Sequence, residues 1–196
     1  MTQVKSVAVY CSASANIDEH YFEQGKILAR DIAKHGMRLV YGGGHVGLMG
    51  IVANEVLANE GEVFGVTTKH LDQYEVGHKG VTELKIVDDM HARKNMMFEE
   101  ADGFIIMPGG FGTLEELFEV ITWKQIGLHD KPIVIVNVDG FWDPLKELMN
   151  SIIKKKFAST TDNAIFLFVD KVEEAISKLT EAPRVAINPS KKWVRE

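Results

Sequence analysis

Cysteine, net positive charge and long apolar runs are all scarce in this sequence. Its 196 residues contain one cysteine, which excludes an internal disulfide and a zinc site built from cysteines. Lysine and arginine total 22 against 28 acidic residues, and the net charge of −6 argues against nonspecific binding to nucleic acid or anionic membranes. No stretch approaches the roughly 18 apolar residues that span a bilayer, and the first residues lack the apolar core of a signal peptide. We therefore expect a cytoplasmic protein that binds neither nucleic acid nor membrane.

Motifs for several common chemistries are also missing. The seven histidines show no metal-ligand spacing, and neither Gly-x-Ser-x-Gly nor a Walker-type Gly-Lys-Ser/Thr occurs. Cys11 follows an apolar run and is more typical of a buried small residue than of a nucleophile. We expect no metal ion and no resident cofactor.

Short β-branched runs alternate with helical stretches along most of the chain. Strands are expected over residues 4–11, 38–41, 62–67, 83–87, 103–107, 132–138 and 164–169. Helices are expected over residues 17–35, 48–59, 89–100, 113–126, 144–155 and 171–180. The strands read as apolar throughout, which is typical of a sheet covered by helices on both faces. This alternation predicts an α/β fold with a doubly wound, Rossmann-like, mostly parallel sheet. We expect a single domain over residues 1–182 and a polar tail, 183–196, packed loosely or onto a partner subunit.

The most informative segment is Met-Pro-Gly-Gly-Phe-Gly-Thr-Leu-Glu-Glu, residues 107–116, which joins an apolar strand to a helix. Ligands of doubly wound folds bind where such turns feed helix N-termini. Gly109, Gly110 and Gly112 allow close backbone approach, and the first helical N–H groups, with those of Phe111 and Thr113, favour an anion. The alternative is a tight turn with a Thr113–Glu116 capping box, which does not need three glycines. We favour a phosphate site.

A second glycine-rich turn, Gly42-x-Gly44-x-x-Gly47, matches the dinucleotide fingerprint in its letters. It follows the second strand, however, and the third strand ends in Thr-Thr-Lys without an acidic residue for a ribose diol. NAD binding is therefore disfavoured. A close strand–helix turn beside a nucleotide pocket and a turn that serves packing alone both remain open.

The third segment is Met-His-Ala-Arg-Lys-Asn-Met-Met, residues 90–97, at the start of an expected helix. Arg93 and Lys94 by themselves would suggest a solvated basic pair beside two glutamates. We expect the strand before this helix to neighbour the strand that ends at Pro108. Both loops would then converge on one pocket.

The motifs together resemble the LOG ("Lonely guy") family of cytokinin-activating phosphoribohydrolases, many of whose bacterial members were labelled lysine decarboxylases. Residues 108–116 correspond to its Pro-Gly-Gly-x-Gly-Thr-x-x-Glu signature, and residues 90–94 to its Met-His-x-Arg-Lys. Further family-like stretches are 42–50, 75–78 with 82–84, 122–125 and 139–144. The likeness extends to about residue 179, with one departure: the usual Cys-Gly-Ser-Ser reads Cys-Ser-Ala-Ser at residues 11–14.

The resemblance implies hydrolysis of an N6-substituted adenosine 5′-monophosphate to free base and ribose 5-phosphate. It also implies that Arg93 and Glu116 are the catalytic pair, that Glu75 and Lys94 contact the nucleotide, and that the protein is a homodimer with its pocket near the interface. Cleavage of a ribosyl C–N bond develops oxocarbenium character, which a carboxylate and an activated water can stabilise. Glu116 would orient or deprotonate the water or screen the sugar, with Glu115, about 100° away on the helix, a weaker candidate. Arg93 would hold ribose or phosphate oxygens.

Two other functions are compatible with parts of this pattern. A pyridoxal-phosphate decarboxylase needs a Schiff-base lysine, and Lys94 beside Arg93 suggests an anion contact instead. A non-catalytic nucleotide or cofactor carrier could use the same glycine loop, but it would need neither Arg93 nor Glu116. We therefore expect a hydrolase, with the carrier as the alternative.

Overall fold

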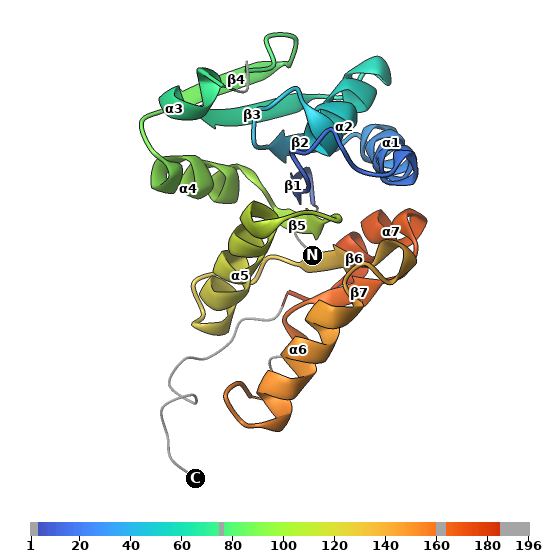
Figure 1. Cartoon of the computed structure of the whole chain (residues 1–196), viewed down its shortest axis with the longest axis vertical. Helices are drawn as coiled ribbons and strands as arrows, with labels where there is room; N and C mark the ends of the chain where they lie inside the picture. Colours follow the sequence, from blue (N-terminus) through green and yellow to red (C-terminus); the bar gives the residue numbers. More distant parts are fainter. Residues whose placement is uncertain (1–3, 75–76, 160–163, 185–196) are drawn as a thin grey trace.

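A computed structural model describes residues 4–74, 77–159 and 164–184. Within these ranges, seven strands form one sheet of order β4-β3-β2-β1-β5-β6-β7, and each neighbouring pair runs parallel (Figure 1). The strands are β1 Ser6–Tyr10, β2 Arg38–Tyr41, β3 Val63–Thr68, β4 Glu83–Val87, β5 Gly103–Ile106, β6 Ile133–Val136 and β7 Leu167–Val169. The helices are α1 Glu19–Lys34, α2 Gly47–Ala58, α3 Lys69–Asp72, α4 Met90–Glu100, α5 Phe111–Gln125, α6 Asp143–Lys154 and α7 Ala175–Glu181, with short 3-10 turns at Val138–Gly140 and Val172–Glu174. The doubly wound α/β prediction is confirmed.

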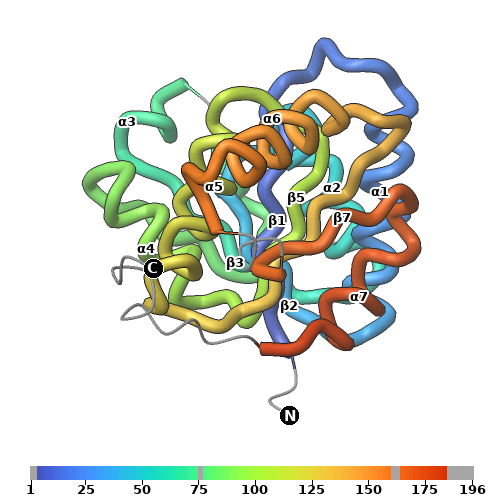
Figure 2. Tube along the Cα trace, turned by 90° about the horizontal axis from the view of Figure 1, so that it is seen from below, coloured from blue at the N-terminus to red at the C-terminus, as the bar shows by residue number. Residues whose placement is uncertain are grey.

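Two apolar clusters cover the two faces of the sheet. Alternate residues of β1 separate them, because Val7 and Val9 join the cluster under α1, α2 and α7, whereas Ala8 and Tyr10 join the cluster under α4, α5 and α6. Figure 2 shows the same arrangement, with α4 and α5 on one side of the strands and α1 and α7 on the other. The central strands are buried on both faces, which explains their continuous apolar sequences.

The edge strand β4 departs from that rule. Its residues are exposed or half-buried, and Glu83 and Lys85 form an ion pair of 2.7 Å on its surface. Charged side chains on an edge strand discourage pairing with other chains. The prediction that all strands are apolar throughout is therefore wrong for this strand.

The expected neighbours around β4 are also wrong. The strand before α4 lies at the far edge of the sheet, with β3, β2 and β1 between it and β5. The two candidate segments nevertheless meet, because α4 crosses back over the sheet and contacts β3, β2 and β1. Figure 1 shows α4 beside α5 on the same face.

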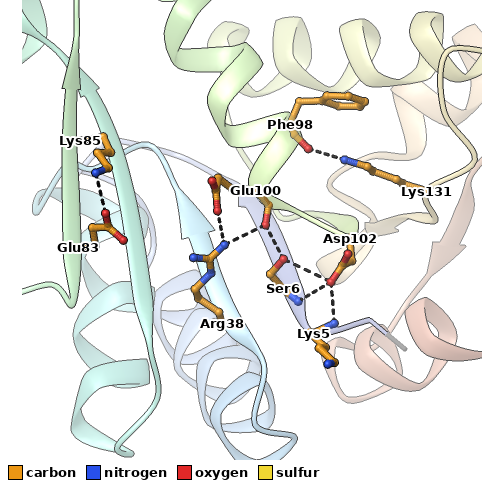
Figure 3. A network of polar contacts seen from close by, with 9 residues as sticks. All are labelled: Lys5, Ser6, Arg38, Glu83, Lys85, Phe98, Glu100, Asp102 and Lys131. Carbon is orange, nitrogen blue, oxygen red and sulfur yellow. Dashed lines mark hydrogen bonds and ion pairs between the residues drawn. The ribbon is translucent and has the colours of Figure 1, made fainter. Parts of the chain in front are cut away.

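A polar network joins the segments at the amino ends of the central strands (Figure 3). The Asp102 carboxylate accepts hydrogen bonds from the backbone N–H groups of Lys5 at 2.8 Å and Ser6 at 3.0 Å. Arg38 binds both the carboxylate and the backbone carbonyl of Glu100. These contacts fix the chain between α4 and β5 against β1 and β2 at the amino ends of the strands. The glycine-rich loops lie at the opposite end of the sheet, beyond the carboxyl ends of the strands.

Two predictions fall on parts of the chain outside the described residues. Glu75 is one, and most of the expected tail, residues 185–196, is the other. Within the described ranges, no helix is both long enough and apolar enough to cross a membrane.

Candidate active site

The loop between β5 and α5 leaves the first turn of α5 open. The helix begins at Phe111, and its N-cap residue, Gly110, has no side chain to accept hydrogen bonds from the first backbone N–H groups. Such donors have no partner within the helix and carry the positive end of its dipole. The start of α5 therefore has the geometry in which helices bind phosphate groups.

The expected start of this helix at residue 113 is wrong, and the Thr113–Glu116 capping box is not formed. Thr113 lies within the first turn, is 4% exposed and packs under the loop. A Cβ added to Gly109 would lie 2.1 Å from the Thr113 hydroxyl oxygen, so packing explains this glycine. A Cβ at Gly110 or Gly112 would meet no atom within 4 Å, so these two glycines keep open space beside the helix N-terminus.

Arg93 is a buried cation with three fixed partners. Its Nε donates to the Val66 carbonyl at 3.0 Å, and its Nη2 donates to the Gly42 carbonyl at 3.3 Å. Its Nη1 lies 3.4 Å from Oε1 of Glu116. Beyond these three oxygen partners, Nη1 also lies 3.9 Å from the Met90 sulfur, so of the five N–H donors of the guanidinium one, on Nη2, is left for a ligand. Carbonyls from the ends of two strands thus aim the guanidinium at α5.

The second glycine-rich turn supports this arginine. A Cβ at Gly42 would lie 2.0 Å from Nη2 of Arg93, so only glycine leaves room for the guanidinium. Gly47 has a φ of +66°, and its added Cβ would lie 2.4 Å from the Ala13 carbonyl oxygen. Close packing therefore explains Gly47, while Gly42 forms part of the wall around Arg93. The sequence left open a turn beside the nucleotide pocket and a turn that serves packing alone. The first applies to Gly42 and the second to Gly47.

Glu116 lies in the second turn of α5, with 13% of its side chain exposed. Burial raises the pKa of this carboxyl group from 4.5 to about 7, with Arg93 opposing the shift and Glu115 adding to it. A carboxyl group that changes charge near neutral pH suits proton transfer. Arg93 holds the group in place without supplying enough charge to keep the pKa at its usual value.

Lys94 is directed to a second pair of carboxylates. Its ammonium group contacts Glu115 and lies 2.8 Å from Oε2 of Glu119, and only 9% of its side chain is exposed. Burial opposes the charge, but the hydrogen bonds to Glu115 and Glu119 raise the pKa of Lys94 overall. Glu119 was not among the site residues predicted from the sequence. Its spacing of four residues from Glu115 places both carboxylates on one face of the helix, which was the available signal.

The first loop, residues 11–14, braces the phosphate loop from β1. The Ser12 N–H donates to the Pro108 carbonyl at 3.2 Å, and the Ser12 carbonyl accepts from the Met49 N–H at 3.2 Å. Cys11 is 7% exposed, and burial raises the pKa of its thiol well above the usual range. The prediction that Cys11 is a buried small residue is confirmed.

The described part of the chain holds no group of three or more histidine, cysteine, aspartate or glutamate side chains placed to bind a metal ion. The site is instead assembled from a helix N-terminus, two cations of α4 and three carboxylates of α5. Within it lie Arg93, Lys94, Glu115, Glu116 and the loop from Gly109 to Thr113. The Phe111 side chain points away from the protein and is 92% exposed.

Comparisons with known proteins give a consistent result. A family described as "Possible lysine decarboxylase" matches residues 49–179. The chain is 38% identical over 197 residues to the cytokinin riboside 5′-monophosphate phosphoribohydrolase LOG1 of Arabidopsis thaliana, covering 100% of this chain and 92% of that protein. It is 39% identical over 178 residues to the probable enzyme of the same name, LOGL1, of Oryza sativa subsp. japonica, covering 91% and 80% of the two chains. The molybdenum cofactor carrier protein of Chlamydomonas reinhardtii has a TM-score of 0.71 at 19% identity, over 90% of this chain and 96% of that one, a likeness of fold.

Proposed function

The chain belongs to the LOG family, whose curated members are named cytokinin riboside 5′-monophosphate phosphoribohydrolases, and from this we propose the reaction it catalyses. It is a hydrolase that cleaves the N-glycosidic bond of adenosine 5′-monophosphates, including those with an N6 substituent. The products are the free base and ribose 5-phosphate. The observation that carries the proposal is the buried Glu116 carboxyl, 3.4 Å from Arg93 and one turn beyond an uncapped helix N-terminus.

The phosphate binds first in this scheme. Backbone N–H groups of Phe111, Gly112 and Thr113 at the start of α5 hold the 5′-phosphate, and the open space at Gly110 and Gly112 accommodates its oxygens. This contact places the ribose at a fixed distance from the second turn of the same helix. The chain's own residues thus position the sugar for the reaction.

Glu116 and Arg93 then act on the ribose. As the C1′–N bond lengthens, positive charge develops on the sugar, and the ionised Glu116 stabilises that charge and takes a proton from the attacking water. The water hydroxyl adds to C1′ while the departing base takes up one proton, so that both parts of the water end in the products. The remaining Nη2 donor of Arg93 binds a ribose or phosphate oxygen through a charge-assisted hydrogen bond. Glu75 and Lys94 match positions that contact the nucleotide in the family pattern, and Glu115 is a weaker candidate for the role of Glu116.

The family's decarboxylase description does not suit the lysine at this site. A Schiff base with pyridoxal phosphate forms from a neutral amine, whereas Lys94 is held as an ammonium by two carboxylates. We expect the purified protein to be colourless, without the absorbance of bound pyridoxal phosphate.

We further propose a homodimer in the cytoplasm. Phe111 and Met90 are both exposed apolar side chains at the edge of the site, which suits contact with a second copy. A molar mass from light scattering near twice 21.9 kDa would support the dimer, and a monomer at all concentrations would contradict it.

Chromatography of the reaction products tests the activity. The protein is incubated with AMP and with isopentenyladenosine 5′-monophosphate, and free base and ribose 5-phosphate are measured. We expect equal amounts of both products and strong loss of turnover in the Glu116→Gln variant. Tight binding of both nucleotides without any release of base would instead favour the carrier function.

A further inference from the structure

Lys94 is a buried cation placed between two carboxylates that belong to successive turns of α5. Glu115 is 54% exposed and Glu119 is 21% exposed, whereas the side chain of Lys94 is 9% exposed. A buried ammonium with two carboxylate partners has its charge satisfied within the protein. Any contact of Lys94 with a nucleotide has to compete with these partners.

Glu116 lies at the centre of this arrangement. Nη1 of Arg93 lies 3.4 Å from its carboxylate, and Lys94, the next residue of α4, binds the carboxylates of Glu115 and Glu119, which lie one and three residues from Glu116 on α5. Tyr10 and Cys11 approach from β1, and burial raises the pKa of both groups, so they remain neutral. Two cations therefore face three carboxylates, and the balance depends on whether Lys94 continues to offset Glu115 and Glu119.

We propose that Lys94 and Glu119 are positioning residues that fix the charge around Glu116 and so set the pH at which Glu116 becomes able to accept a proton. Lys94 offsets Glu115 and Glu119, whose negative charges would otherwise oppose ionisation of Glu116. Glu119 in turn keeps the Lys94 ammonium over α5. This inference rests on the proposed hydrolase function for its kinetic arm.

Neutralising Lys94 and neutralising Glu119 should shift the acid limb of the pH–rate profile in opposite directions. In Lys94→Met the two carboxylates lose their cation, and the acid limb of kcat/KM moves to higher pH by about one unit, since a single charge within several ångströms has an effect of this size. In Glu119→Gln one negative charge is removed, and the limb moves to lower pH. In the double variant the two effects offset each other, and the limb returns toward its wild-type position.

Inhibition by inorganic phosphate distinguishes this function from direct binding of phosphate. Kinetics with AMP are measured for each variant over a range of pH, with and without inorganic phosphate as a competitor. We expect Lys94→Met to shift the acid limb of kcat/KM and to leave the inhibition constant of phosphate within about twofold of the wild-type value. Weaker inhibition by phosphate together with an unmoved acid limb would overturn the proposal and identify Lys94 as a phosphate ligand.

Carbon-13 NMR of the glutamate side-chain carboxyl groups gives a readout that does not depend on activity. The Glu116 resonance is assigned by its loss in Glu116→Gln and titrated in wild type, Lys94→Met, Glu119→Gln and the double variant. Glu147→Gln, a charge-matched change on the exposed face of α6, is the control and should leave the titration unmoved. If wild type releases no base, the proposed function fails, yet the titration still tests the charge arrangement. Glu119→Gln buries no new group. If the Glu116 carboxyl titrates at the same pH in this variant as in wild type, the proposal is refuted.

Discussion

Glu116→Gln should make the protein more stable at alkaline pH while it removes activity. The pKa of Glu116 is about 7 in the folded protein against 4.5 for an ordinary glutamate, which corresponds to about 3 kcal/mol at 1.36 kcal/mol per pH unit. Between these two values the folded protein binds the proton more tightly than the unfolded chain does. Wild-type stability therefore falls as the pH rises from 4.5 to 7 and is level above that range.

The amide of glutamine removes this pH dependence. It occupies nearly the same volume, and its carbonyl oxygen still accepts a hydrogen bond from Arg93, which lies 3.4 Å away in the wild type. The gain in free energy of unfolding over wild type should be about 2 kcal/mol larger at pH 8 than at pH 5, because at pH 5 most of the folded wild type is already protonated. Turnover should fall by about 10²-fold or more.

Urea unfolding at pH 5 and pH 8 measures the stability change. Glu147→Gln, which removes an exposed carboxylate from α6, is the control and should give the same small difference from wild type at both pH values. If Glu116→Gln differs from wild type by an equal amount at the two pH values, Glu116 does not carry a raised pKa. The assignment of a proton-transfer role would then lose its physical basis.

Two further substitutions test the geometry of the site, and a third, at Asn137, tests the turn between β6 and α6. Gly42→Ala places a Cβ 2.0 Å from Nη2 of Arg93, so kcat/KM should fall by about 10²-fold while circular dichroism shows that the chain still folds. Normal activity would show that Gly42 is not needed to make room for the guanidinium. Gly110→Ala adds a methyl group to open space, so the unfolding midpoint should be nearly unchanged while KM for AMP rises about tenfold. Asn137→Ala removes the side-chain oxygen that accepts a 2.7 Å hydrogen bond from the backbone N–H of Trp142. Urea unfolding should show that the free energy of unfolding falls by about 2 kcal/mol.

Local patterns were sufficient to predict most of the fold. Apolar runs located the central strands to within a few residues, because strands buried on both faces consist of apolar residues. The start of α5 was misplaced because Gly110 caps the helix without a side chain, and the rule for caps favours Thr113. The four-residue helix α3 was missed because it is shorter than a typical periodic segment.

At the site, the contacts between residues far apart in the sequence could not be predicted from local patterns. The motif around Arg93 was correctly expected to meet the glycine loop, although for the wrong reason, since β4 and β5 are not adjacent. Strand order depends on crossover connections that no local pattern encodes. Glu119 was missed for a similar reason, because its partner Lys94 lies on another helix.

The three oxygen acceptors of Arg93 come from different parts of the sheet: Gly42 follows β2, Val66 lies in β3, and Glu116 lies on the helix after β5. No single fragment of the chain contains all of them. In a partly folded form that has lost either β2 or β3, the guanidinium is no longer oriented toward α5, even if the glycine loop persists. Loss of catalysis in denaturant should therefore come no later than the loss of either strand, which makes hydrolysis a sensitive reporter of the intact native state.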